Sequence, residues 1–300
     1  MSSSRHIISR WAMAVFFLGS TQPANTSLTL ETYTPGPIAY HNLVHGEALE
    51  YEAGWNGIPA AKATIVTECN PENCNLYNIC AQAWTENLIS KLWRMRDTVM
   101  TTMDAALFRP IRMILTQDEN NEVSSRKVDF AYDEKSIKVR KEKNNDVTFE
   151  EFPLGLACDP VSAVFLFRSI DLHVGETIET DVCDGNGIFR LQVKVEAMEN
   201  VKIGIGTFPA YRLNVAIEKI YPVSTDMEKK GKIKWVKLWV SADPTRILLL
   251  LKSKVFIGHV YIELISENRG MVASLNQIIS SLNPRQCLPA TPRDVQQCSR

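Results

Sequence analysis

Residues 189–217 read FRLQVKVEAMENVKIGIGTFPAYRLNVAI, and the alternation within this stretch decides the fold class. Apolar side chains occupy every second position at its start, with Arg190, Gln192 and Lys194 between them. The same alternation returns from Tyr211 to Ile217. A period of two residues is typical of a strand that buries one face. The stretch therefore predicts two antiparallel strands.

Outward from this stretch, alternating segments recur from Leu49 to Ile265. Asn56-Gly57, Asp184-Gly185-Asn186-Gly187, Lys230-Gly231 and Gly258 separate them, and glycine and asparagine are the residues that a reversing backbone needs at positive φ. No segment of 20 to 50 residues repeats itself. The pattern predicts one domain of many antiparallel strands.

One segment breaks the alternation. Asp159 is followed by Pro160 and an apolar run, which is the start signal of a helix, and the helix is expected to extend to Ser169. Helical spacing places Val161, Val164 and Phe165 on one face, which would pack against the sheet. Arg168 follows at the end of the helix. We predict a mainly β protein, an antiparallel, strongly curved sheet or barrel with one central helix packed on or inside it. Closure or a covering helix would protect the sheet edges.

The N-terminus has the pattern of a signal peptide. Arg5 and Arg10 precede a short apolar run, 11–19, and a small and polar stretch, 20–25. Cleavage is expected near Ala24, with cleavage after Ser20 as the alternative. The run is shorter than the roughly 20 apolar residues that cross a bilayer. We expect an exported protein, periplasmic in a Gram-negative bacterium or secreted, that is not an integral membrane protein.

We divide the chain into a signal peptide (1–24), an N-terminal extension (25–44), a β domain (45–267) and a C-terminal tail (268–300). Removal of residues 1–24 takes away two of the 33 Lys and Arg and none of the 34 Asp and Glu, so the net charge changes from −1 to −3. A basic surface is the electrostatic feature of nucleic-acid binding. Nucleic acid is therefore not an expected partner.

Seven cysteines suit an oxidising compartment. We predict three disulfide bridges, each between two cysteines that flank one turn, helix or loop. Seven is an odd number, so one thiol stays unpaired, and Cys80, inside an apparent strand, is the candidate. The predicted pairs are Cys69 with Cys74 across a turn-rich tetrapeptide, Cys158 with Cys183 around the helix, and Cys287 with Cys298 in the tail.

The sequence contains no recognisable catalytic or metal-binding motif. Its five histidines form no zinc-binding helical pair, and no nucleophile elbow is present. Gly204-Ile205-Gly206 is followed by a strand instead of a helix, so a turn is expected there and not a phosphate loop. We expect no enzyme activity, no metal and no cofactor.

Three segments are similar to one protein family: GEALEYEAGWNGIPAAKA (46–63), DPVSAVFLFRSIDLHVGE (159–176) and WVSADPTRILLLLKSKVFIGHVYIEL (239–264). They resemble, in order, the DUF3108 family of uncharacterised exported bacterial envelope proteins. The resemblance implies the envelope location and the helix ending in an arginine before a glycine turn, here Gly175. It implies no reaction. Ala61 stands where many relatives have glycine.

Six residues in or beside these segments are candidate ligand-binding residues: Trp55, Asp159, Arg168, Trp239, Asp243 and Arg246. For Trp55 we favour a core tryptophan at a hairpin over a ligand contact, by about two to one. Asp243 is expected either to satisfy its own turn backbone or to pair with Arg168. A cluster of the two arginines with Asp159 and Asp243 would be a structural lock or the polar end of a ligand pocket.

These observations lead to two hypotheses about function. The first is a non-catalytic envelope protein that binds a lipid-like or other apolar ligand in a β cavity, a role suggested by fold-level analogy. The alternative is an interaction or assembly module of the cell envelope without a small-molecule ligand. The expected partner is accordingly a lipid or another envelope component.

Overall fold

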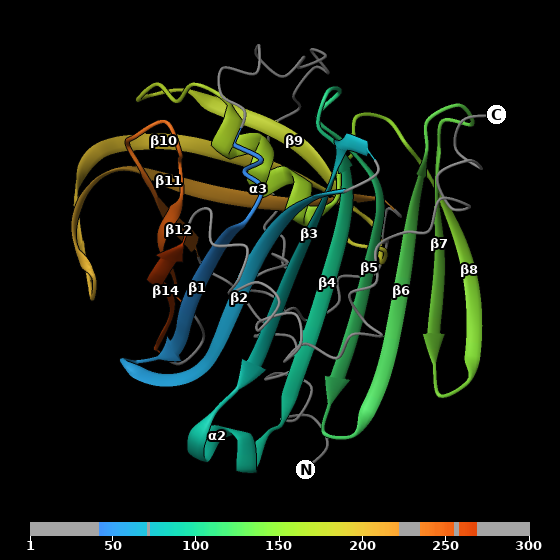
Figure 1. The fold of residues 1–300 in the computed structure, drawn as a ribbon, viewed down its shortest axis with the longest axis horizontal. Coiled ribbons are helices and arrows are strands. Elements are labelled where there is room, and N and C mark those ends of the chain that lie inside the picture. Colours follow the sequence, from blue (N-terminus) through green and yellow to red (C-terminus); the bar gives the residue numbers. More distant parts are fainter. Residues whose placement is uncertain (1–41, 71–72, 222–234, 255–257, 269–300) are drawn as a thin grey trace. The chain divides into compact units, whose positions relative to one another are not determined.

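The computed structural model describes residues 42–70, 73–221, 235–254 and 258–268. The predicted signal peptide, most of the N-terminal extension, the Lys230-Gly231 turn and nearly all of the C-terminal tail lie outside these residues. Within them the chain is mainly β and antiparallel, as predicted (Figure 1). The described strands, in chain order, are β1 (Glu47–Trp55), β2 (Ile58–Asn70), β3 (Asn73–Thr85), β4 (Met95–Asp104), β5 (Arg109–Glu119), β6 (Glu122–Ala131), β7 (Ser136–Lys143), β8 (Asp146–Pro153), β9 (Thr177–Cys183), β10 (Ile188–Ile203), β11 (Gly206–Tyr221), β12 (Trp235–Ser241), β13 (Leu248–Lys254) and β14 (His259–Asn268).

The described strands follow one hydrogen-bonded order, β8-β7-β6-β5-β4-β3-β2-β1-β14-β13-β12-β11-β10-β9. Strands β8 and β9 end this order, so among the described strands the sheet is open and the barrel alternative does not apply. Most neighbours in the sheet are also neighbours in sequence, because short turns join successive strands. The long strands β10 and β11 bend strongly along their length (Figure 1). The predicted curved antiparallel sheet is confirmed.

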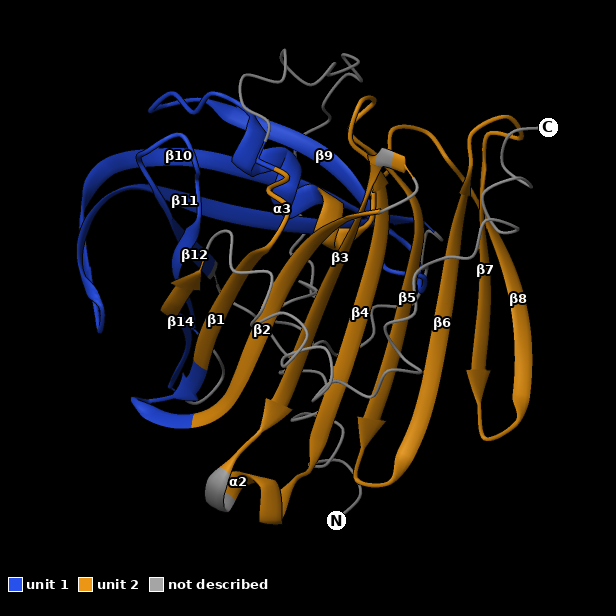
Figure 2. Ribbon diagram, viewed as in Figure 1, with its two compact units in different colours: residues 1–42, 53–59, 163–264 blue, residues 43–52, 60–162, 265–300 orange. Residues whose placement is uncertain are grey.

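The chain divides into two compact units (Figure 2). Unit 1 contains Asn42, Ala53–Pro59 and the described part of Ala163–Leu264. Unit 2 contains Leu43–Glu52, Ala60–Ser162 and the described residues after Leu264, apart from the gap at 71–72. Strands β1 and β2 and the helix that follows β8 pass from one unit to the other. Each unit is described below by itself.

The core of unit 2 lies on one face of strands β2 to β8. Five side chains form a cross-strand row on this face, and none of them is more than 1% exposed: Ile79, Thr101, Met113, Val128 and Val139. A second buried row on β6, β7 and β8 consists of Phe130, Ile137 and Phe152. Each large apolar side chain buried here contributes about 1.5 to 3 kcal/mol of transfer free energy. We call the surface formed by these two rows the apolar face.

Unit 1 has the core that the alternation predicted. Val195 of β10, Leu213 of β11 and Leu251 of β13 are buried in one cross-strand row. The polar residues between the buried positions of β10 point to the other face. The β10–β11 hairpin also reaches β14, because the backbone N–H of Gly204 donates a hydrogen bond of 2.6 Å to Oε1 of Glu263. The predicted turn at Gly204-Ile205-Gly206 is confirmed.

The β1–β2 hairpin has the turn that its sequence predicts. Asn56 and Gly57 both have positive φ, at 50° and 82°, as the two central residues of a type I′ turn require. Asn56 also joins this turn to β14. Its backbone N–H donates to the carbonyl oxygen of His259 (2.9 Å), and its Oδ1 accepts from the His259 N–H (2.8 Å). The asparagine therefore serves both the turn and the strand beside it.

The predicted helix is α3 (Pro160–Ser169). Phe165 is buried, as expected, but Val164 is 43% exposed, so its assignment to the packed face was wrong. Ser162 and Ser169 are buried instead, because the helix turns its polar and small side chains inward. A second helix, α2 (Asn87–Leu92), was not predicted; it has only six residues and no side-chain cap. No helix in the described residues is long and apolar enough to cross a membrane.

Candidate functional site

Asp159 caps the N-terminus of α3 in unit 2. Its Oδ1 accepts hydrogen bonds from the backbone N–H groups of Val161 (2.9 Å) and Ser162 (3.1 Å) and from Oγ1 of Thr101 on β4 (2.9 Å). Its Oδ2 accepts from the Ser162 hydroxyl. Burial raises the pKa of this carboxyl, and the hydrogen bonds oppose that change. The predicted capping role is confirmed, and these contacts are structural.

Arg168 lies at the end of α3 in unit 1 and is almost fully buried. Its Nε donates to the carbonyl oxygen of Thr245 at 3.1 Å, and its guanidinium carbon lies 4.7 Å from the centre of the Phe165 ring. Asn42 joins the same region, since its Nδ2 donates to the carbonyl oxygens of Arg168 and Pro244, the latter at 2.8 Å. Arg168 therefore ties the helix end to the β12–β13 turn.

The β12–β13 turn is closed by its own side chains. Oδ1 of Asp243 accepts from the Thr245 N–H at 2.8 Å and from the Thr245 hydroxyl, so the predicted turn role of this aspartate is confirmed. Arg246, with φ at 48°, donates from Nη1 to the carbonyl oxygens of Ala242 and Asp243. Its guanidinium carbon lies 4.9 Å from the centre of the Tyr211 ring. The turn brings Arg168, Asp243 and Arg246 together, whereas Asp159, the fourth member of the predicted cluster, bonds at the start of α3 to Thr101, Val161 and Ser162.

Trp55 does not occupy the core. The side chain is 45% exposed at the end of β1, one residue before the turn. Our preferred interpretation of a buried tryptophan was therefore wrong, because the strand turns this position outward where the hairpin ends.

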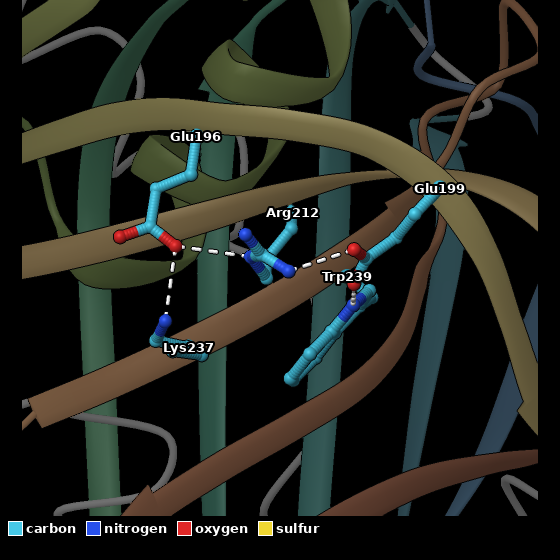
Figure 3. Close-up of polar contacts among 5 residues, drawn as sticks. All are labelled: Glu196, Glu199, Arg212, Lys237 and Trp239. Carbon is cyan, nitrogen blue, oxygen red and sulfur yellow. Dashed lines mark hydrogen bonds and ion pairs between the residues drawn. The ribbon is translucent and has the colours of Figure 1, made fainter.

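Trp239 belongs to a charged network on β10, β11 and β12 (Figure 3). Its Nε1 donates to Oε1 of Glu199 at 2.8 Å, and Arg212 bridges Glu199 (2.7 Å) and Glu196 (3.0 Å). Lys237 completes the network with a contact of 3.0 Å to Glu196. The β-bulge between Val195 and Ala197 leaves Glu196 without a directly opposite residue on β11. We call these five residues the Trp239 network.

The Trp239 network stabilises its carboxylates in the ionised form. The hydrogen bond from Lys237, followed by that from Arg212, lowers the pKa of Glu196. The hydrogen bond from the Trp239 indole, together with the charge of Arg212, lowers the pKa of Glu199. Each carboxylate is already matched by donors and cations of the protein itself. The network is therefore better suited to fixing the bent β10–β11 hairpin than to binding a ligand.

A polar cluster that the sequence analysis missed lies in unit 2, on the same side of the sheet as the apolar face. It consists of Asp97 on β4, Gln117 and Glu119 on β5, and Arg126 on β6. Asp97 lies directly opposite Gln117, and Arg126 opposite Leu115. Nη2 of Arg126 donates to Oε1 of Gln117 at 2.8 Å, and Nε2 of Gln117 donates to Oε1 of Glu119 at 3.3 Å. We call these four residues the buried polar end.

Two carboxyls of the buried polar end are strongly perturbed. Asp97 is 7% exposed, and among the described residues neither of its oxygens has a partner in good hydrogen-bond geometry. Burial raises the pKa of Asp97 to about 7, although the Asp118 N–H and the Gln117 side chain lie near enough to oppose the change. Burial, followed by the charge of Asp97, raises the pKa of Glu119 to about 7. Carboxyls perturbed in this way are frequent at functional sites.

A signal for this cluster was present in the sequence. On β4, Asp97 shares the face of Met95 and Val99, and this strand is buried on both faces from Asp97 to Met103. Arg126 stands likewise in the phase of Val128 on β6. A charged residue at an apolar position of an alternating strand is unusual. Only the strand register shows that these positions are neighbours.

The disulfide predictions remain predictions. Cys158 and Cys183 are buried and Cys69 is half-buried. The Cys74 side chain, Cys287 and Cys298 lie outside the described residues. A search of the described residues finds no group of three or more His, Cys, Asp or Glu side chains that could hold a metal ion.

Comparison with known proteins supports the fold and identifies the family. A β-barrel-like protein of the DUF1849 domain from Brucella abortus matches with a TM-score of 0.50 and 11% identity, over 76% of this chain and 99% of that one. Two further structures have TM-scores of 0.32 and 0.31: a protein with a YmcC-like fold from Bacteroides fragilis and a protein from Parabacteroides distasonis. Each is 11% identical and matches over 75% of this chain and 96% of its own. No curated protein matches the sequence. The family model described as "Protein of unknown function (DUF3108)" matches residues 50–265, so the chain belongs to the DUF3108 family.

Proposed function

We propose that this chain is a non-catalytic protein of the bacterial cell envelope that binds a lipid-like ligand, whose chain replaces protein groups now packed on the apolar face of unit 2. The observation that supports this most is the order of side chains along the sheet. Apart from Thr101, which bonds to Asp159, the face is apolar from the Phe130 and Ile79 rows to Val99 and Leu115; it then changes to the buried polar end. An amphipathic ligand has the same order of properties, an apolar chain followed by a polar head.

The energetics favour such a ligand over a small polar one. Each methylene group of the ligand that leaves water contributes about 0.8 kcal/mol, so the ligand chain, less the packing of the protein groups that it replaces, would supply most of the affinity. The few polar groups at one end would then orient the ligand, as in other sites that are mostly apolar. Export to the envelope is proposed from the signal-peptide pattern. The proposal contains no reaction, because an apolar face suits retention of a chain and not chemistry on it.

Mass spectrometry of the full chain, purified from a periplasmic expression host, tests the proposal. We expect the non-denaturing spectrum to contain an additional mass of lipid size that is absent under denaturing conditions. Lipid extraction from the same sample would identify the ligand class. A bare protein mass, together with no displacement of a fluorescent fatty-chain probe, would exclude the lipid-binding role.

An interaction module is the second candidate, favoured by strand β8. This strand has β7 on one side and no neighbour on the other among the described strands. Phe149 is 75% exposed and Val147 is 40% exposed on one face of it. Exposed apolar side chains on an edge strand are typical of pairing with another chain.

Cross-linking in intact cells tests this alternative. If β8 docks a partner, Phe149→Ser should abolish a specific cross-linked species while the melting temperature stays unchanged. Val174→Ser, a change at another exposed apolar residue, is the matched control. An unchanged cross-linking pattern in Phe149→Ser would remove the support for this candidate.

A further inference from the structure

The charges around the buried polar end do not balance. Asp118 pairs with Arg94 at 2.5 Å, and Glu122 pairs with Lys143 at 3.1 Å. This leaves two further carboxyls, Asp97 near the Arg126 guanidinium and Glu119 near the Lys143 ammonium that already pairs with Glu122. The ionised site is therefore one positive charge short.

Asp97 is the group that most needs a partner. More than nine tenths of the residue is buried, and within the described part of the chain its carboxyl oxygens lack a donor in good geometry. Gln117, opposite on β5, accepts from Arg126 and donates one N–H to Glu119, and its remaining N–H lies near Asp97 without reaching good hydrogen-bond geometry. A buried carboxylate without donors is strongly disfavoured, so either a proton or an external cation must neutralise it.

We propose that the buried polar end binds the ammonium headgroup of an amphipathic amine. This inference rests on the proposed function, since it takes the ligand chain to lie along the apolar face. The ammonium donates to the carboxylates of Asp97 and Glu119 and supplies the missing charge. Glu119 is half-buried and one residue from the β5–β6 turn, so the pair leads from the interior to the rim of the sheet.

Other occupants fit less well. An anionic headgroup would meet two carboxylates and one guanidinium, which is a net repulsion. A divalent cation wants six or more oxygen ligands or several nitrogen and sulfur ligands, and the described residues hold no cluster of three candidate side chains. A monovalent ammonium needs only hydrogen-bond acceptors and one unit of compensating charge.

Titration calorimetry with the full chain at pH 8 tests the inference. The probes are dodecylammonium, dodecyl sulfate and dodecyl maltoside, each below its micelle concentration, and ethanolamine as a headgroup without a chain. We expect dodecylammonium to bind at least about tenfold more tightly than the other two amphiphiles, as one charge-assisted contact allows. Ethanolamine should bind more weakly than dodecylammonium, because it lacks the chain.

A substitution at Asp97 tests whether this residue causes the preference for dodecylammonium. Asp97→Asn keeps the shape of the side chain and removes its charge, so the preference for dodecylammonium should disappear while the affinity for dodecyl maltoside is kept. Asp133→Asn is the matched control, since Asp133 is exposed in the β6–β7 turn. If Asp97→Asn does not fold, titration of the wild type at pH 5 replaces it: protonation of the carboxyl pair should remove the same preference.

The outcomes separate this inference from the function on which it rests. Equal binding of all three amphiphiles would overturn the ammonium site and leave lipid binding intact. Binding of ethanolamine as tight as that of dodecylammonium would overturn the role of the chain. Failure of every amphiphile to bind would overturn both proposals.

Discussion

The Trp239 network in unit 1 and the buried polar end in unit 2 both place two carboxyls near basic groups, yet their protonation behaviour is opposite. Arg212, Lys237 and the Trp239 indole lower the pKa values of Glu196 and Glu199. Burial raises the pKa values of Asp97 and Glu119. The first pair is matched by donors at the edge of solvent, and the second is desolvated without enough donors.

Unmatched buried carboxyls distinguish a candidate binding site from a structural cluster. A satisfied network stabilises one arrangement of strands and has little left to offer a ligand. A buried carboxyl without a hydrogen-bond partner destabilises the fold. Its presence therefore indicates a proton, an ion or a ligand that compensates for the missing partner. Asp159 shows that burial alone is not the distinction, because its four hydrogen bonds come from the protein.

The largest expected effect is the pH dependence of stability caused by Asp97. Its pKa in the folded state, about 7, is above the ordinary value of 3.8, so the folded protein retains a proton that the unfolded chain releases. The contribution of Asp97 to stability is therefore full below about pH 4, falls as the pH rises to about 7, and then levels off. The loss should reach up to about 4 kcal/mol. Urea unfolding of wild type and Asp97→Asn at pH 4, 5.5, 7 and 8 measures it. Glu119 still titrates in the variant, so a wild-type profile no steeper than that of Asp97→Asn would contradict the prediction.

The next largest effect is expected for Asp159, the buried carboxylate that accepts four hydrogen bonds from the protein. Asp159→Ala removes the cap of α3 and the acceptor of Thr101, and should destabilise the protein by about 2 to 3 kcal/mol. Asp159→Asn keeps an acceptor oxygen and should cost less than half as much. Urea unfolding at pH 6 compares the two variants. Equal losses would mean that charge, and not hydrogen bonding, is what the site needs.

A smaller effect is expected in the Trp239 network. Arg212→Leu removes the bridge between Glu196 and Glu199 and should cost about 1 kcal/mol, since the groups are partly exposed. The pKa values of both glutamates should rise towards their ordinary range, which carboxyl NMR titration can follow. Because the depressed values favour the fold only above them, this contribution stays constant from pH 5 to 8. Lys194→Ala, an exposed change on β10, should leave both glutamates unaffected.

The smallest effect is expected for the Lys143–Glu122 pair at the rim of the buried polar end. Both side chains are largely exposed, so Glu122→Gln should change stability by less than about 0.5 kcal/mol. Loss of its negative charge should lower the pKa of Glu119 slightly, because Glu122 is one of the charges that raise it. A thermal melt and the same NMR titration measure both. A stability change as large as that of Arg212→Leu would remove the distinction between exposed and partly buried pairs.

Much of the architecture could be predicted from local patterns. The strands around Val193 and Leu213, the Asn56-Gly57 turn and the helix start at Asp159 and Pro160 each depend on a few neighbouring residues. Local physics therefore suffices for them: period two for half-buried strands, positive φ for turns, and an acceptor at a helix start. Val164 and Trp55 were placed wrongly because the direction in which a side chain faces depends on what packs against it.

The candidate site could be predicted only in part. Asp243 and Arg246 belong together through a short turn, and that proximity is visible in sequence. Asp97 and Arg126 lie on β4 and β6, and strand register alone makes them near neighbours. Sequence by itself determined the antiparallel β class, the hairpin turns, the capped helix and the family, because each follows from residues close together in the chain or from ordered segments. The tertiary structure alone decided which charges are matched and which are buried without donors, because burial and pairing are properties of strands brought together from distant positions.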